Sequence, residues 1–150
     1  SDSYPDALRR SALNSYVLLQ PEEVEFYGAF YQRLFARLPD VKRYFLPERM
    51  TSQFSMLNRA IKLLVEFDPE QAASVAQLTR LAQRHRAYGL GRQHLDGFQS
   101  ALLETLQQSR HVDPAALEAW TQIVGRAMNE LWRELQSPTA TRASAPPPPG

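Results

Sequence analysis

The chain has 150 residues, which is enough for one domain with a sizeable hydrophobic core. Its formal charge of +1, without a stripe of lysine or arginine, argues against nucleic acid as a partner. No apolar run approaches the roughly 18 residues that span a bilayer, and no signal-peptide pattern is present. The absence of cysteine excludes disulfides, thiolate catalysis and cysteine-ligated metal centres, and the expected location is the cytoplasm.

Hydrophobic periodicity predicts helices along almost the whole chain. No segment alternates apolar and polar residues between hairpin turns, and no internal repeat is present. Proline and glycine mark the expected breaks. The expected helices are 5–19, 22–38, 40–45, 48–67, 69–88, 93–110 and 114–136. The predicted architecture is therefore all-α, with six to eight helices joined by short turns.

Two of these helices have unusual inward faces. In the second helix, Tyr31 and the neighbouring phenylalanines form a stripe wide enough to contact neighbours on two sides. In the long helix that follows, Gln53 is the polar residue on an otherwise apolar side. The next helix is expected to begin with Asp68 as its cap and Pro69 in its first helical position.

One helical stripe carries a histidine into an apolar face. Leu78, Leu81, His85 and Tyr88 follow one another at spacings of three and four, and the stripe ends at Gly89, a natural helix stop. Two interpretations are open. His85 is either a core residue satisfied by a backbone carbonyl, which is the commoner case for a lone helical histidine, or a ligand.

Few other residues indicate chemistry. No pair among His85, His94 and His111 has the spacing of a zinc site on one helix, and His111 is expected to be solvated. The Gly-Leu-Gly at 89–91 follows a helix and not a strand, so it is not a phosphate loop. No nucleophile elbow is present. If the chain performs chemistry, a cofactor must supply it.

Several segments, taken in order and at compatible spacings, resemble a bacterial globin. They are Ser-Tyr at 15–16, Phe-Tyr-Gln-Arg-Leu-Phe at 30–35, Leu-Pro-Asp-Val at 38–41, Tyr-Phe at 44–45, Met-Thr-Ser-Gln at 50–53, Leu-Ala-Gln-Arg-His-Arg-Ala-Tyr-Gly-Leu at 81–90 and Glu-Ala-Trp at 118–120. The resemblance covers roughly 8–135. It is closest to single-domain bacterial haemoglobins and to the globin domain of flavohaemoglobins, and it implies a globin fold around a haem pocket.

The composition changes near the end of the chain. Residues 1–137 form the expected globin domain, and 138–150 are rich in proline, alanine, serine and threonine, with four consecutive prolines at 146–149. Such a segment cannot bury apolar surface and is expected to be disordered or extended. It is either a frayed tail or a linker to a further domain.

The resemblance assigns a role to several residues. His85 matches the proximal ligand of the iron of haem b, and its second ring N–H should donate to a carbonyl in the same helical turn. Phe45 matches the phenylalanine that stacks on the haem. Tyr31 and Gln53 match the distal polar pair that can hydrogen-bond a bound diatomic ligand. Leu57 matches the apolar residue that limits the space over the iron.

Each assignment has a plainer alternative. Tyr31 could be an edge-of-core tyrosine, Gln53 a surface glutamine and Phe45 an ordinary core residue. The resemblance as a set favours the haem pocket. The implied pocket residues are Phe45, Gln53, Leu57, His85, Tyr88, Leu90 and Phe98.

Two positions depart from the family's pattern. Flavohaemoglobins carry a tyrosine where this chain has Leu95, and a glutamate in the last helix where it has Leu135. There the carboxylate makes the proximal histidine more electron-donating. Without it, reversible binding is favoured over oxygen activation, although Glu134 is adjacent and a small bend could bring it toward His85.

The resemblance therefore implies a globin that reversibly binds O2, and NO and CO as well. Three functions are compatible with it: a carrier or scavenger, a gas sensor that controls a fused C-terminal domain, and a nitric-oxide dioxygenase that works with a separate reductase. The two leucines disfavour the enzyme. A globin-fold interaction domain without haem is a further alternative, and a dimer could form through the last two helices if Trp132 is exposed.

Overall fold

The computed structural model describes residues 6–136, which are entirely helical and turn, without strands. The elements are α1 (Asp6–Leu19), η1 (Gln20–Glu22), α2 (Glu23–Arg37), η2 (Pro39–Tyr44), η3 (Pro47–Arg49), α3 (Met50–Val65), α4 (Ala72–Arg86), α5 (Arg92–Gln107) and α6 (Pro114–Gln136). Six α-helices and three short 3₁₀ turns confirm the all-α prediction. The expected boundary at 137 and the Pro-rich segment 138–150 lie outside the described residues.

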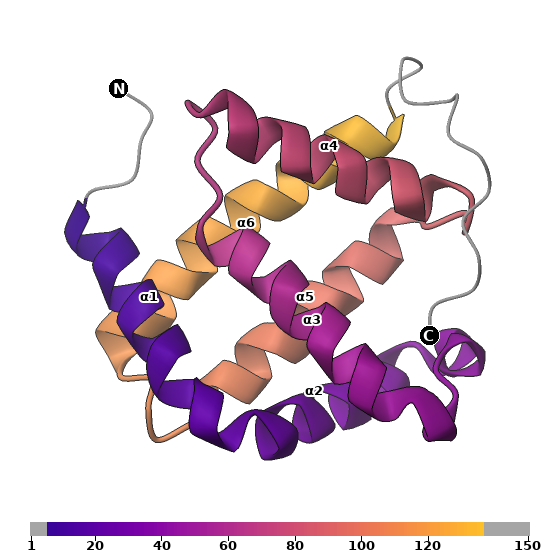
Figure 1. Cartoon of the computed structure of the whole chain (residues 1–150), viewed down its shortest axis with the longest axis horizontal. Coiled ribbons are helices and arrows are strands. Elements are labelled where there is room, and N and C mark those ends of the chain that lie inside the picture. The colour runs from indigo at the N-terminus through magenta and orange to yellow at the C-terminus, as the bar shows by residue number, and fades with distance from the viewer. Residues whose placement is uncertain (1–5, 137–150) are drawn as a thin grey trace.

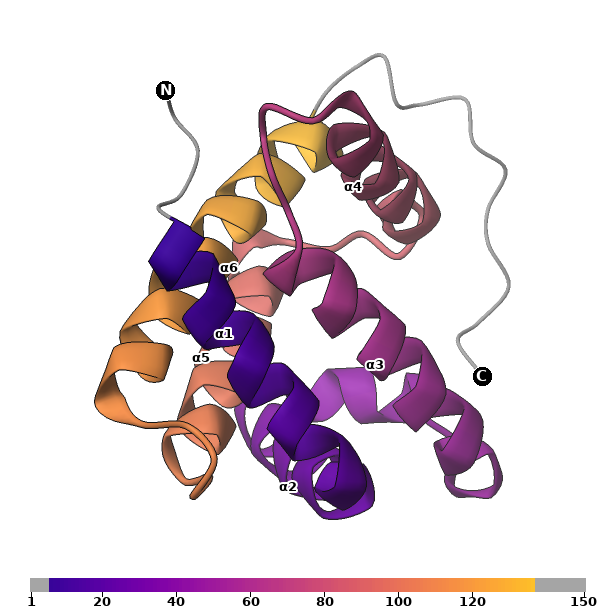
Figure 2. The same ribbon diagram turned by 60° about the vertical axis from the view of Figure 1, so that its left-hand side comes forward.

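The last helix is central to the packing. α6 packs against α1, α3, α4 and α5, and α2 packs on α5 and α3. Figures 1 and 2 both show the C-terminal end of α6 beside α4, while α2 lies at the opposite end of the molecule. The face of α6 from Ala116 to Leu131 is buried, so this helix contributes much of the hydrophobic core. Across residues 6–136, the molecule contains no helix with the length and apolar character of a membrane span.

The wide aromatic stripe of α2 contacts helices on two sides, as expected. Phe26, Tyr27, Phe30, Tyr31 and Leu34 are all buried. Consecutive residues project about 100° apart on a helix. In each of the neighbouring pairs Phe26–Tyr27 and Phe30–Tyr31, one ring can therefore face α5 while the other faces α3. This arrangement brings Tyr31 to the side of α2 that faces α3.

The start of α4 differs from the prediction. The Asp68 carboxylate accepts the N–H of Glu70 at 2.9 Å, and the N–H of Asp68 donates to the Ser74 hydroxyl at 2.9 Å. These bonds form a turn stabilised by the aspartate side chain, so Pro69 is not in a helix and α4 begins at Ala72. Beyond the other end of α4, Gly89 has φ of +68°, the left-handed conformation expected of a glycine helix stop.

Two side chains expected at the surface are partly buried. His111 was expected to be solvated, but its Nε2 lies 3.0 Å from a carboxylate oxygen of Glu22, at the junction of η1 with the loop before α6. Hydrogen bonds from His111 and Arg110 lower the pKa of Glu22. Trp132, whose exposure was the condition for the dimer considered above, is half-buried and packs against the core.

The largest buried side chain has its one polar atom satisfied by α1. The indole N–H of Trp120 donates to the Ser15 hydroxyl at 2.7 Å, and that hydroxyl donates to the Ala12 carbonyl at 2.8 Å. Replacing Ser15 by alanine leaves the buried indole N–H without a partner. We expect the free energy of unfolding to fall by about 1–3 kcal/mol in a urea titration.

Ser11→Ala is the matched control, because it makes the same change in helix propensity on α1. It should leave stability within about 0.5 kcal/mol of the parent. Equal stability of the two variants would show that the Trp120–Ser15 bond contributes nothing.

Candidate functional site

A cluster of aromatic rings joins α2 to the segment that precedes α3. The Tyr31 ring lies 5.2 Å from the Phe45 ring and 5.8 Å from the Phe54 ring, with the latter pair nearly parallel at 12°. Phe35 completes the cluster at 5.6 Å from Tyr31 and 5.4 Å from Phe45. Phe45 stands at the end of η2, so this short turn is what brings it against Tyr31. Of the predicted pocket residues, Phe45 thus shares one cluster with Tyr31.

The two predicted distal residues are in contact. The Tyr31 side chain is 5% exposed, and its hydroxyl donates to the backbone carbonyl of Gln53 at 3.3 Å. Burial raises the pKa of Tyr31 well above its ordinary value, so the phenol keeps its proton at neutral pH and acts as a donor. The hydroxyl is therefore directed at the α3 backbone.

Gln53 is the polar exception on the inward face of α3, as predicted. Its side chain is only 1% exposed, and its Nε2 is buried without a hydrogen-bond partner among the described residues. A buried donor without a partner costs about 1–3 kcal/mol, so such groups in native proteins usually have a ligand or a water as partner. Leu57, one turn later on α3, is buried and apolar. Of the two predicted distal residues, Gln53 is therefore the one with an N–H still available to donate to a ligand.

His85, in the last turn of α4, uses one ring nitrogen within its own helix. Its Nδ1 lies 2.9 Å from the Leu81 carbonyl, an oxygen that can only accept, so Nδ1 carries the proton. Burial is the main cause that lowers the pKa of His85; the bond to Leu81 opposes this shift, and the Arg84 guanidinium adds to it. The ring is therefore neutral at pH 7, with a lone pair on Nε2. This is the state of a metal-ligating imidazole.

The protein does not build a metal site from its own side chains around this histidine. Within residues 6–136, no group of three or more histidine, cysteine, aspartate or glutamate residues could hold an ion. His85 offers an uncommitted imidazole nitrogen, and Gln53 offers a buried amide donor.

A pair of tyrosines joins the two halves of the candidate pocket. The Tyr88 ring lies 6.1 Å from the His85 ring and 5.6 Å from the Tyr44 ring, edge to face. Tyr44 directly precedes Phe45, so η2 contacts the Tyr31 cluster with one aromatic residue and the turn after α4 with the other. The Tyr44–Tyr88 contact was not predicted from the sequence. The one sequence signal for it is that Tyr44 directly precedes the predicted pocket residue Phe45.

The remaining predicted pocket residues are Phe98 and Leu90. Phe98 on α5 is half-buried and meets Phe30 edge to face at 5.1 Å, while Phe30 lies 5.3 Å from Tyr31. Leu90 is half-buried in the turn after α4. Phe98 is therefore connected to the distal cluster through one intervening ring.

The two positions at which flavohaemoglobins carry the tyrosine and the glutamate hold leucines in this chain. Leu95 is buried, and Leu135 packs against the core. The Glu134 carboxylate accepts the Thr79 hydroxyl at 2.7 Å, while His85 Nδ1 is bonded to the Leu81 carbonyl. Glu134 does not support the imidazole in this structure.

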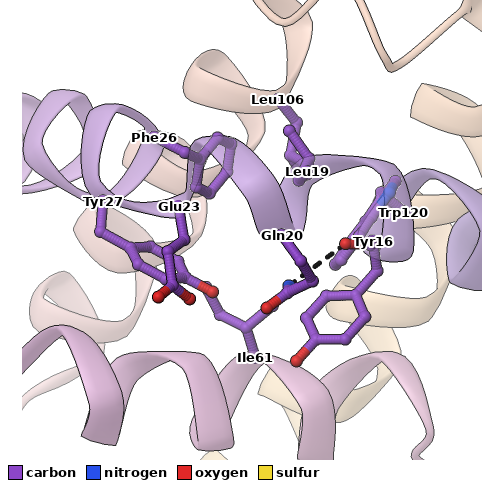
Figure 3. A pocket seen from close by; sticks show the side chains of 9 residues that line it. All are labelled: Tyr16, Leu19, Gln20, Glu23, Phe26, Tyr27, Ile61, Leu106 and Trp120. Atoms are coloured by element: carbon purple, nitrogen blue, oxygen red, sulfur yellow. Dashed lines mark hydrogen bonds between the residues drawn. The ribbon is translucent and has the colours of Figure 1, made fainter.

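A second polar cluster lies away from this pocket, between α1, α2 and α3. There the Asn58 side-chain oxygen accepts hydrogen bonds from Tyr16 at 3.0 Å, from Gln20 at 3.3 Å and from Tyr27. Tyr16, Gln20 and Tyr27 line a cavity of about 10 Å³, drawn in Figure 3, which is at the lower limit for one water molecule. The hydroxyl and amide donors of Tyr16, Gln20 and Tyr27 are already satisfied by Asn58.

Comparisons with known proteins identify the family and the fold. A sequence model of the Globin family matches residues 28–131, a range that includes Tyr31, Gln53 and His85. The structure is similar to that of protein PA3967 from Pseudomonas aeruginosa PAO1, which is described as structurally highly homologous to a human hemoglobin. The TM-score is 0.72 at 24% sequence identity, over 87% of this chain and 99% of that one. No curated protein sequence matches the chain. Since the family model covers more than half of the sequence, the chain belongs to the globin family.

Proposed function

We propose that this globin binds haem b through His85 Nε2 and reversibly binds O2, and NO and CO as well, on the opposite side of the haem. The observation that carries the proposal is the state of His85, which is neutral, with Nδ1 bonded inside its helix and Nε2 uncommitted. Membership of the globin family implies a haem cofactor. Bound haem would supply a ferrous iron that can bind a diatomic gas, and His85 would hold that iron.

The distal residues suit a polar diatomic ligand. The buried amide of Gln53 has an N–H to donate, and Tyr31 holds the backbone of Gln53 in place through its hydroxyl. A hydrogen bond to a ligand that gains negative charge is stronger than one between neutral groups. Because this donor is buried, bulk water does not compete for it.

The proximal side supports reversible binding over oxygen activation. An imidazole that donates to a backbone carbonyl is a weaker electron donor than one that donates to a carboxylate. Because Glu134 is bonded to Thr79, we place carrier or sensor functions ahead of nitric-oxide dioxygenation with a separate reductase. We also propose that residues 1–137 form the globin unit and that the Pro-rich 138–150 segment is either a tail or a linker.

Optical spectroscopy of haem-loaded protein tests the proposal. The dithionite-reduced protein should show the spectrum of a five-coordinate ferrous haem, and CO and O2 should each convert it to a distinct six-coordinate form. O2 should leave again under argon without oxidation of the iron. Failure to retain haem, or immediate oxidation with O2, would contradict the proposed function.

A further inference from the structure

Near the C-terminal end of α6, one carbonyl lacks the i+4 N–H donor that a continuing α-helix would supply. In an α-helix the carbonyl of Glu134 would accept the N–H of residue 138, but residue 138 is proline and has no N–H. Carbonyls in the last turn of a helix need partners from outside the helix. The chain must therefore supply another donor at this position or leave the carbonyl to water.

The donor comes from the residue that follows His85. The Arg86 guanidinium donates to the Glu134 carbonyl at 2.6 Å, and the Thr79 hydroxyl donates to the Glu134 carboxylate at 2.7 Å. Both donors belong to α4, so one residue of α6 holds α4 at two points. The positive charge of Arg86 also lies at the C-terminal, negative end of the α6 dipole.

This attachment is tight because the guanidinium is partly desolvated. Arg86 is half-buried, and its Nε is fully buried without a partner among the described residues. Loss of the bond to Glu134 would leave more of a buried charge unpaired, which is costly. α4 packs mainly on α6 and only slightly on α3, so the Glu134 contacts hold the helix that carries His85.

We infer that Arg86 and Thr79 clamp the end of α6 to α4 and thereby position His85, with Glu134 acting through them and not on the imidazole itself. The inference rests on the proposed function for the ligand role of His85. As a consequence, a displacement of the helical turn that carries His85 should displace the last turn of α6, because Glu134 is bonded to α4. Arg86, Thr79 and Glu134 are positioning residues.

The test compares Arg86→Ala with Arg84→Ala, the matched control. Arg84 flanks His85 on the other side, carries the same charge and is exposed. Hydrogen exchange is measured on the full chain as purified, at the amides of residues 131–136. We expect about tenfold faster exchange in Arg86→Ala, no change in Arg84→Ala, and partial restoration in Arg86→Lys, whose ammonium can still donate to the carbonyl.

A second readout addresses His85 itself. The iron–imidazole stretching band of the ferrous protein should shift or broaden in Arg86→Ala and Thr79→Val. It should stay unchanged in Glu134→Gln, whose amide oxygen still accepts from Thr79. A shift in Glu134→Gln as large as that in Arg86→Ala would overturn the inference, because it would make the carboxylate a partner of the imidazole.

The two proposals fail in distinguishable ways. If the parent protein lacks an iron–imidazole band, the proposed function fails, while hydrogen exchange still tests the clamp. If residues 131–136 exchange at the parental rate in Arg86→Ala and in Thr79→Val, the clamp is refuted even when haem binds normally. Should Arg86→Ala fail to fold, Thr79→Val compared with Arg84→Ala still tests the clamp.

Discussion

Replacing His85 by alanine is expected to abolish stable haem binding. Loss of residues that only support a metal ligand costs about 10–100-fold in affinity, so loss of the ligand itself should exceed 100-fold. Titration of the apoprotein with hemin, followed by Soret absorbance and by gel filtration, measures the effect. The Soret peak of the bound form should be absent at stoichiometric hemin.

The other two histidines are the matched controls for this variant. His94 accepts the Gly91 N–H at the start of α5, and His111 pairs with Glu22. Neither contact involves the candidate pocket, so His94→Ala and His111→Ala should retain haem. Circular dichroism separates loss of haem from loss of fold. An unchanged Soret spectrum in folded His85→Ala would show that another group holds the iron.

Replacing Gln53 by leucine is expected to speed O2 release by about 10–100-fold, the value of one hydrogen bond to a charged acceptor. Stopped-flow displacement of O2 by CO measures the rate. CO accumulates little negative charge, so the CO dissociation rate should change only a few-fold. Tyr31→Phe should have the smaller effect on O2, because the Tyr31 hydroxyl donates to the Gln53 backbone. A larger effect of Tyr31→Phe would make Tyr31 the donor that faces the ligand.

The Gln53→Leu substitution should not destabilise the haem-free protein. Leucine is close to glutamine in size and removes a buried N–H that has no partner. We expect the free energy of unfolding of the apoprotein to stay level or to rise by about 1 kcal/mol. Most substitutions at buried positions lower stability, so this result would show that Gln53 is kept at a cost in stability.

Much of the fold could be predicted from local patterns. The helical periods and the prolines at 21, 39, 47 and 114 placed the helices to within a few residues, and the turn at Gly89 after α4 follows from glycine conformation. The start of α4 was misplaced because the Asp68 side chain forms a turn with Glu70 and binds Ser74, a local competition that helix-cap patterns do not resolve.

The site was predicted less completely, because its details depend on partners far apart in the sequence. The stripe of Tyr31 and the inward Gln53 could be read from helical spacing, and the Leu81 carbonyl partner of His85 is a contact within one helix. The Thr79–Glu134 bond joins residues 55 positions apart, and no local pattern indicates which acceptor or donor each will find. The partnerless amide of Gln53 likewise appears only when its neighbours are in place.

The low-frequency resonance Raman spectrum of the ferrous protein tests the central claim most directly. We predict an iron–imidazole stretching band that moves to lower frequency when histidine is labelled with heavy nitrogen. The band should vanish in His85→Gly and return when free imidazole is added to that variant. A spectrum without an isotope-sensitive band, or a band that persists in His85→Gly, would contradict the assignment of His85 as the iron ligand of this globin.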